Sequence, residues 1–480
     1  MAHQVDIPGG ASGSAEAPAA EKPHRFGLTA AMALIVGSII GVGIFNLPTS
    51  LASYGPITLV SMALTTVGAL ALALLFAALS RRLPADGGPY AYARVAFGNR
   101  LGFANAWSYW ITAWAGNAAI AVGWVLYVEH FINTGHNKLY SVLLVLAGLW
   151  IPAAINLTGV KNMGSVQIIT TIVKFVALAF VAIVGLFYIK SANYTPWNAS
   201  SESAINAIGG GMAIALFSYL GVECAAVAAA KVRDPDRNVP RATVLGTIAT
   251  AVVYMLSLTA VFGIVPSSKL SSATAPFSDA VNTMFGGTWA GNVMAVAVII
   301  SGFGALNGWT MICAEMPLAA ASDGLFPERF KHISKRGVPA FGIIASTVLA
   351  SIAMIINYLG SAGETVFTTL VLMTGITSAI PYGFSALAQL KWRWIDHKTT
   401  QTARFARDMI VAVLAVLFSI LFIVYSRNTG HSFWVYWAPY FLAAGALLLG
   451  IPVYLGQRGH MSKPAAVPPY RPPATSGTHS

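Results

Sequence analysis

The feature that most constrains this chain is a series of twelve long apolar runs. The runs are continuous rather than alternating and about 18–25 residues long, which is typical of helices that cross a hydrocarbon core of about 30 Å. They begin near residues 29, 56, 104, 141, 166, 207, 242, 289, 340, 365, 409 and 434. In lipid every backbone N–H and C=O must be paired within the protein. The sequence therefore predicts an all-α polytopic membrane protein of about twelve transmembrane helices.

The composition agrees with this prediction. Of the 480 residues, 56% are hydrophobic and 9% are charged, whereas roughly a quarter are charged in a soluble domain. The mean hydropathy is +0.69. Cys224 and Cys313 both lie inside apolar runs, which argues against an extracellular disulfide framework. A chain of this composition cannot cover itself with a polar surface.

The net charge of +12 is a signal of topology. Basic residues gather in the loops after the second, sixth, eighth and tenth runs, whereas the opposite loops hold little more than Lys138, Lys190, Lys269 and Arg427. By the positive-inside rule both termini are cytoplasmic, in a cell (plasma or inner) membrane. We see no basic and aromatic patch of the kind that nucleic-acid binding needs, and we expect no such partner.

Three regions are expected along the chain. Residues 1–25 are rich in Ala, Gly and Pro and predict a disordered cytoplasmic tail, without the order of a cleaved signal peptide. Residues 26–457 form the transmembrane domain. Residues 458–480 are a second, Pro-rich cytoplasmic tail.

Glycines interrupt two of the apolar runs. The first contains Gly37, Gly41 and Gly43, and the sixth contains residues 209–211, all glycine, and then Gly221. Because glycine in a helix interior costs about 1 kcal/mol relative to alanine, such clusters predict breaks at mid-membrane. Close helix packing through small residues is the alternative. The breaks lie five runs apart, which favours two inverted repeats, about residues 29–190 and 206–390, followed by two helices at about 409–457.

Several stretches resemble the amino acid–polyamine–organocation superfamily. They are residues 37–48, a predicted loop at residues 87–94 (GGPYAYAR) and residues 221–241, which contain DPDRNVPR. Residues 308–327 are similar to the basic amino acid/polyamine antiporter branch, which includes arginine/agmatine and arginine/ornithine exchangers. The resemblance covers roughly residues 26–460. It implies a five-plus-five inverted-repeat core, discontinuous helices 1 and 6, alternating access, and often a homodimer packed through helices 11 and 12.

The broken helices are expected to bind the polar ends of an amino acid. The amides of Gly41, Val42 and Gly43 begin a half-helix whose positive dipole end suits a carboxylate. The freed carbonyls around Ile39, Phe217 and Leu220 suit an ammonium group. The family often has a hydroxyl where this chain has Val42, so that the site could also take a polyamine or a decarboxylated amine.

Further pocket residues follow from the resemblance. Trp309 matches a tryptophan over the cationic end of the substrate, and Asn117 matches an amide that binds its distal end. Thr112 and Thr374 match positions that line the pocket. The structural alternatives are that Trp309 is a tryptophan packed in the core and that Asn117 makes an interhelical hydrogen bond.

Gate residues are implied in the same way. Phe217 stands where the arginine/agmatine exchanger has a tryptophan lid, while Tyr109 and Tyr382 match an outer and an inner gate. Simple packing is the alternative for both tyrosines.

Three charged residues lie inside apolar runs, where a charge costs about 2.5–3.5 kcal/mol. Glu223 matches the glutamate that couples protonation to gating, and a structural hydrogen bond to freed amides is its alternative. Lys174 resembles a lysine whose ammonium replaces a sodium ion in other branches, and snorkelling to the cytoplasmic surface is its alternative. Glu315 has no assigned role.

These residues predict a secondary active transporter that exchanges cationic amino acids or their amine products, without a cofactor or metal. A proton-coupled amino acid symporter is the second hypothesis, and a non-transporting receptor is a third. An enzyme would need a nucleophile, a metal site or paired carboxylates, and we find no such set of residues in the sequence.

The loop charges generate a test of orientation. A thiol-directed, membrane-impermeant reagent is expected to label Lys138→Cys only from outside and Arg233→Cys only from inside, because no other assignment satisfies the charge bias. Labelling of both positions from one side would overturn the topology.

Overall fold

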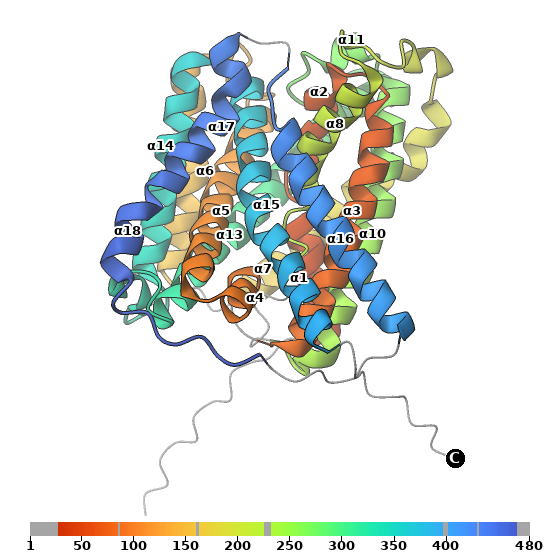
Figure 1. Cartoon of the computed structure of the whole chain (residues 1–480). Helices are drawn as coiled ribbons and strands as arrows, with labels where there is room; N and C mark the ends of the chain where they lie inside the picture. Colours follow the sequence, from red (N-terminus) through yellow and green to blue (C-terminus); the bar gives the residue numbers. More distant parts are fainter. Residues whose placement is uncertain are drawn as a thin grey trace, which may run out of the picture.

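The structure is a computed structural model that describes residues 27–84, 87–159, 163–224, 232–396, 402–429 and 432–467. Within these ranges it is a bundle of helices without a strand (Figure 1). Eleven of the described helices are long and apolar enough to cross a membrane, and a shorter apolar helix spans Ala204–Tyr219. This confirms the predicted all-α, multi-pass fold. The predicted tail at residues 1–25 lies outside the described residues.

The first half of the bundle holds the first broken helix (α1 and α2), four continuous spans and the short helix α4. Their bounds are α1 (Leu28–Ile39), α2 (Gly43–Ala52), α3 (Thr58–Arg82), α4 (Pro89–Phe97), α5 (Asn99–Val128), α6 (Lys138–Leu157) and α7 (Met163–Val184). The short helix α4 replaces the loop that the sequence predicts at residues 87–94. It begins with Pro89 after Gly87 and Gly88, which both have positive φ. Proline at the first helical position favours a helix start because its missing N–H would have no partner there.

The second half repeats this order. Its helices are α8 (Ala204–Ala215), the 3-10 turn η3 (Leu216–Tyr219), α10 (Pro235–Ile264), α13 (Trp289–Ser322), α14 (Ala340–Gly360) and α15 (Gly363–Ile395), with short helices α11 (Ser267–Leu270) and α12 (Pro276–Phe285) between α10 and α13. The last helices are α16 (Thr402–Tyr425), α17 (Phe433–Leu448) and α18 (Gly450–Gln457). The short elements η1 (Gly185–Tyr188), η2 (Ser191–Tyr194) and η5 (Glu328–Lys331) complete the set.

The two halves pack against each other through corresponding helices. Helix α3 packs against α10, and α5 packs against both α13 and α15 at the centre of the bundle. Helix α1 packs against α7 and α10, while α2 packs against α8 and α12. Figure 1 shows α1 and α4 toward one end of the bundle, and α2, α8 and α11 toward the other. We call the end at which α3 ends and α10 begins the basic end, because it carries Arg81, Arg82 and Arg241.

A polar cluster closes the basic end near α4. Arg94 pairs with Asp323 at 2.6 Å, and Tyr90 donates a hydrogen bond to the same carboxylate at 3.0 Å. Arg94 Nη2 also donates to the Oγ of Ser462 at 2.7 Å. The first residues of the predicted C-terminal tail therefore lie against the helical bundle, whereas residues 468–480 lie outside the described part.

Candidate functional site

A small cavity lies in the middle of the bundle, where the break between α1 and α2 meets the end of η3. Its volume is about 10 Å³, no more than the space that one water molecule needs. It is lined by Ser38, Ile39, Gly41, Gly43, Gly116, Ile120, Phe217, Leu220 and Trp309. None of these side chains is charged, and the cavity between the two discontinuous helices therefore has a neutral described lining.

Many of the residues predicted to bind substrate meet at this cavity. Those that line it are Ile39, Gly41, Gly43, Phe217, Leu220 and Trp309. Ser38, Gly116 and Ile120 also line it and were not predicted. Small residues at 38 and 116 carry no chemistry that a sequence pattern would single out.

Val42 is not among the lining residues. A Cβ added at Gly302 of α13 would lie 2.5 Å from Val42 Cγ2, which places the valine methyl against that helix. The backbone of Val42 stays beside the cavity, since Gly41 and Gly43 both line it.

The two predicted threonines each bond a carbonyl of their own helix, and Thr112 Oγ1 also forms a hydrogen bond with Thr377 Oγ1 of α15 at 2.9 Å. Thr112 Oγ1 donates to the Ser108 carbonyl at 3.0 Å, and Thr374 Oγ1 donates to the Val371 carbonyl at 2.6 Å. A Cβ at Gly116 would lie 3.8 Å from Thr374 Cγ2, so that Thr374 turns its methyl group toward the cavity wall.

Asn117 follows Gly116 on α5 and is buried. Its Nδ2 donates to Thr310 Oγ1 at 3.2 Å, which is the interhelical hydrogen bond that the sequence left as an alternative. Its Oδ1 is buried and accepts no hydrogen bond from the described residues. An unpaired buried acceptor is costly, and a donor from a bound solute would satisfy it.

The carbonyl end of α1 is satisfied by side chains from three other helices. Lys174 Nζ of α7 donates to the Gly37 carbonyl at 2.6 Å, Trp309 Nε1 of α13 to Ser38 at 3.4 Å, and Tyr254 of α10 to Ile39 at 3.0 Å. Tyr254 was not predicted. Because a helix leaves its last carbonyls without partners, these donors replace the backbone bonds that the break removes.

Lys174 lies deep in the protein. Its side chain is fully buried, and the hydrogen bond to Gly37 directs the ammonium toward the break in the first transmembrane span. It therefore does not snorkel to a surface in this structure. Glu315 on α13 is only partly buried and does not line the cavity.

The amides at the start of α2 are less completely engaged. The Gly41 amide donates to the Ile39 carbonyl at 2.9 Å, and that of Phe45 to Val42 at 3.1 Å. The amides of Val42 and Gly43 have no acceptor among the described residues. The positive end of the α2 dipole therefore remains available to an anionic group.

Glu223 holds the second break together on the side of the basic end. One carboxylate oxygen accepts from Tyr109 of α5 at 2.8 Å, and the other accepts from Tyr382 of α15 at 2.7 Å and from the Gly221 amide at 3.2 Å. All three side chains are buried. The two tyrosines, predicted as outer and inner gates, therefore bind one carboxylate at one level of the bundle.

Gly221 brings the two breaks into backbone contact. Its φ is +106°, and a Cβ there would lie 2.8 Å from the carbonyl carbon of Ser38. Only glycine fits such a backbone readily. The two discontinuous helices therefore touch directly beside the cavity.

Phe217 forms one wall of the cavity. A Cβ at Gly43 would lie 2.8 Å from the Phe217 ring, so that the ring rests on the start of α2. The ring also packs edge-to-face against Phe367 of α15, with centroids 6.0 Å apart. The ring thus covers the cavity between α2 and α15.

Two discontinuous helices that meet across a small mid-bundle cavity define the class of secondary transporters with an inverted-repeat core. The sequence profile of the amino acid permease family matches residues 26–446, and the chain belongs to this family. This confirms the superfamily that the sequence resembles.

Curated relatives narrow the branch. The chain is 31% identical to a putrescine transporter of Haemophilus influenzae, over 83% of this chain and 91% of the relative. It is 29% identical to an arginine/ornithine antiporter of Pseudomonas aeruginosa, over 83% and 86% of the two chains. It is 28% identical to a cadaverine/lysine antiporter of Escherichia coli K12, over 78% and 84%. These relatives support the basic amino acid/polyamine antiporter branch.

The contact between the breaks can be tested by stability. Gly221→Ala is expected to lower the free energy of unfolding by about 1–3 kcal/mol, because the new Cβ meets the Ser38 backbone at a positive φ. Thermal unfolding of the purified protein in detergent measures the change. The matched control is Gly116→Ala, whose Cβ meets its nearest atom at an ordinary 3.8 Å. Equal stability of the two variants would contradict the proposed contact.

Proposed function

We propose that this protein exchanges cationic amino acids or their amine products across the membrane by alternating access. The solutes named for its relatives are putrescine, cadaverine, lysine, arginine and ornithine. Lysine and ornithine carry an ammonium group on the side chain, arginine carries a guanidinium group, and putrescine and cadaverine are diamines. The proposal extends this shared chemistry to the present chain.

The observation that carries the proposal is the cavity with an uncharged lining and Trp309 on its wall. Asn117 does not line the cavity, but it follows the lining residue Gly116 on α5, and its Oδ1 is buried without a partner among the described residues. An indole face stabilises a cation by about 0.5–2 kcal/mol, depending on desolvation. Asn117 Oδ1 supplies an acceptor for an N–H donor. The free amides of Val42 and Gly43 suit the carboxylate of an amino acid, and a diamine would leave them to water.

We also propose that the protein lies in the plasma or inner membrane with both termini cytoplasmic, since the basic loops lie at one end. The resemblance further supports a homodimer packed through α16 and α17. The outer face of α17 is strongly apolar, with Phe433 and Trp434 63% and 72% exposed.

Counterflow tests substrate class and exchange together. In proteoliposomes loaded with unlabelled arginine, ornithine, lysine or putrescine, labelled arginine or putrescine is expected to accumulate, while liposomes loaded with a neutral amino acid remain near background.

Trp309→Leu should weaken the binding of cationic solutes more than that of neutral analogues of similar size, because the cation–π interaction is lost and most apolar contact remains. Equal losses would reduce Trp309 to a packing residue.

A proton-coupled symporter is the second candidate, and the buried Glu223 and Lys174 favour it. An exchanger should show counterflow without accumulation driven by a pH gradient, whereas a symporter should show both. Glu223→Gln mimics the protonated carboxyl group, so that exchange should persist while its pH dependence flattens. In a symporter the same variant should lose concentrative uptake.

Lys174→Met provides the matched test of the buried ammonium. If this ammonium fills a cation site, the wild type needs no sodium, and replacing sodium by choline should leave uptake unchanged. Strict sodium dependence of the wild type would reject this role for Lys174. Unaltered pH dependence in both Glu223→Gln and Lys174→Met would remove the two residues from the coupling mechanism.

A further inference from the structure

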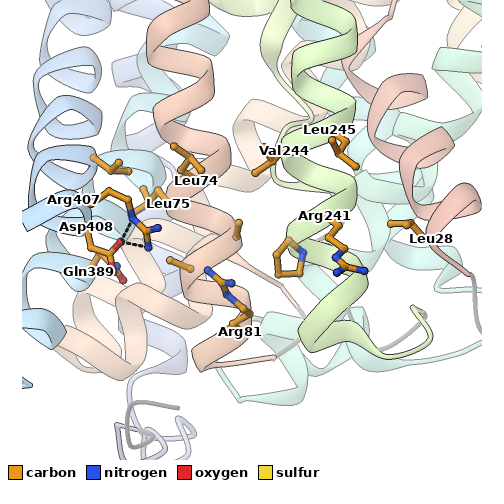
Figure 2. A pocket seen from close by; sticks show the side chains of 14 residues that line it. Leu28, Leu74, Leu75, Arg81, Arg241, Val244, Leu245, Gln389, Arg407 and Asp408 are labelled. Carbon is orange, nitrogen blue, oxygen red and sulfur yellow. Dashed lines mark hydrogen bonds and ion pairs between the residues drawn. The ribbon is translucent and has the colours of Figure 1, made fainter. Parts of the chain in front are cut away.

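A second and much larger cavity lies away from the substrate site, at the basic end. Its volume is about 540 Å³, and it opens between α3, α10 and α16, with the start of α1 and the end of α15 at its margins. Figure 2 shows its lining from close by. The lining residues are Leu28, Leu74, Leu75, Ala77, Ala78, Arg81, Pro240, Arg241, Val244, Leu245, Gln389, Arg407, Asp408 and Val411.

One part of the cavity is apolar and open to the membrane. Leu74 of α3 and Leu245 of α10 are 43% and 47% exposed, although both belong to helices that are long and apolar enough to span the bilayer. At this depth the surrounding medium is hydrocarbon. The leucines therefore form a wall that suits an acyl chain.

The other part of the cavity is positively charged. Arg81, Arg241 and Arg407 come from α3, α10 and α16 respectively, and Asp408 is the single acidic residue of the lining. Figure 2 shows the Arg407 guanidinium turned to Asp408, at 3.1 and 2.9 Å. Asp408 also pairs with Arg393 at 2.6 Å, so that its charge is already balanced.

Arg241 differs from the other arginines of the cavity. Arg241 and Arg407 are both exposed, but only Arg407 pairs with Asp408, whereas Arg241 makes no hydrogen bond or ion pair with the described part of the chain. A guanidinium group presents a fork of N–H donors that matches phosphate oxygens. Among the described residues Arg241 is thus unpaired at the rim of the cavity, and its guanidinium group is available to a phosphate oxygen.

We propose that this cavity binds an anionic phospholipid of the surrounding leaflet. The phosphodiester lies among Arg81, Arg241 and Arg407, and an acyl chain lies along Leu74 and Leu245. A basic cavity between transmembrane helices at the side where the loops are positive is suited to such headgroups. A free anion would use the arginines but leave the leucine wall without an occupant.

The position of the site gives the lipid a structural effect. It would bridge α3 of the first repeat and α10 of the second, which pack against each other. It would also touch Leu28, at the start of the half-helix α1. Bound lipid therefore stabilises the junction of the repeats next to a discontinuous helix.

Lipid titration of the purified full chain tests the proposal without using transport. Native mass spectrometry or thermal shift in neutral detergent gives the apparent Kd for phosphatidylglycerol, for phosphatidylcholine with the same acyl chains, and for inorganic phosphate. Arg241→Gln removes the free guanidinium, and Arg241→Lys keeps the charge. The matched control is Arg100→Gln, which removes an exposed arginine of the same end outside the cavity.

Phosphatidylglycerol is expected to bind the wild type more tightly than phosphatidylcholine. Arg241→Gln should weaken it about fivefold, since one basic residue contributes about that factor near an anionic lipid. Arg241→Lys should lose less, and Arg100→Gln should match the wild type. Equal binding of the two lipids, equal protection by inorganic phosphate, or equal losses in Arg241→Gln and Arg100→Gln would each overturn the proposal.

Discussion

The arrangement of this protein depends on backbone groups that its broken helices leave without partners. In hydrocarbon an unpaired carbonyl or amide costs several kcal/mol, and the bilayer offers no water to replace the missing bond. In this protein side chains from neighbouring helices supply hydrogen bonds to many of these backbone groups. Lys174, Trp309 and Tyr254, from three different helices, donate hydrogen bonds to the last carbonyls of α1. The Glu223 carboxylate accepts hydrogen bonds from the Gly221 amide and from two tyrosine hydroxyls. The same donors and acceptors thereby fix the helices that surround the cavity.

This constraint explains why the charged residues inside the membrane are found where they are. Lys174 belongs to the continuous helix α7, but its ammonium, like the carboxylate of Glu223, is hydrogen-bonded to backbone groups of a broken span. A carboxylate is a strong acceptor and an ammonium a strong donor, and each can satisfy groups that a neutral side chain would satisfy less well. The central cavity has no charged residue in its described lining. The charged side chains of Lys174 and Glu223 therefore hold the broken helices in place without lining the cavity themselves.

The sequence was sufficient for the fold and for much of the cavity. Hydropathy located the spans because every lipid-facing helix must be apolar, and Gly41, Gly43 and Gly221 marked the two breaks. The prediction of a break at residues 209–211 was wrong, because these glycines lie inside the continuous helix α8 and allow close packing against Tyr54, Ser61 and Tyr425. Three helices begin several residues before their apolar runs. Helix α5 begins at Asn99, α10 at Pro235 and α16 at Thr402, ahead of the runs near 104, 242 and 409, because their first turns are polar and hydropathy does not detect them. The role of Tyr254 could not be predicted, because nothing in the residues around it distinguishes it from any other tyrosine of an apolar helix. Its hydrogen bond to Ile39 forms only because α10 packs against α1.

The small volume of the central cavity has a consequence for the membrane as a barrier. Protons cross proteins along files of hydrogen-bonded water, and a chamber with room for about one water molecule cannot hold such a file. Phe217 rests on the start of α2 on one side of the cavity, and the Glu223 cluster lies on the other. A transporter in this conformation therefore offers protons no continuous file of water through the cavity, and the proton gradient across the membrane is not short-circuited there.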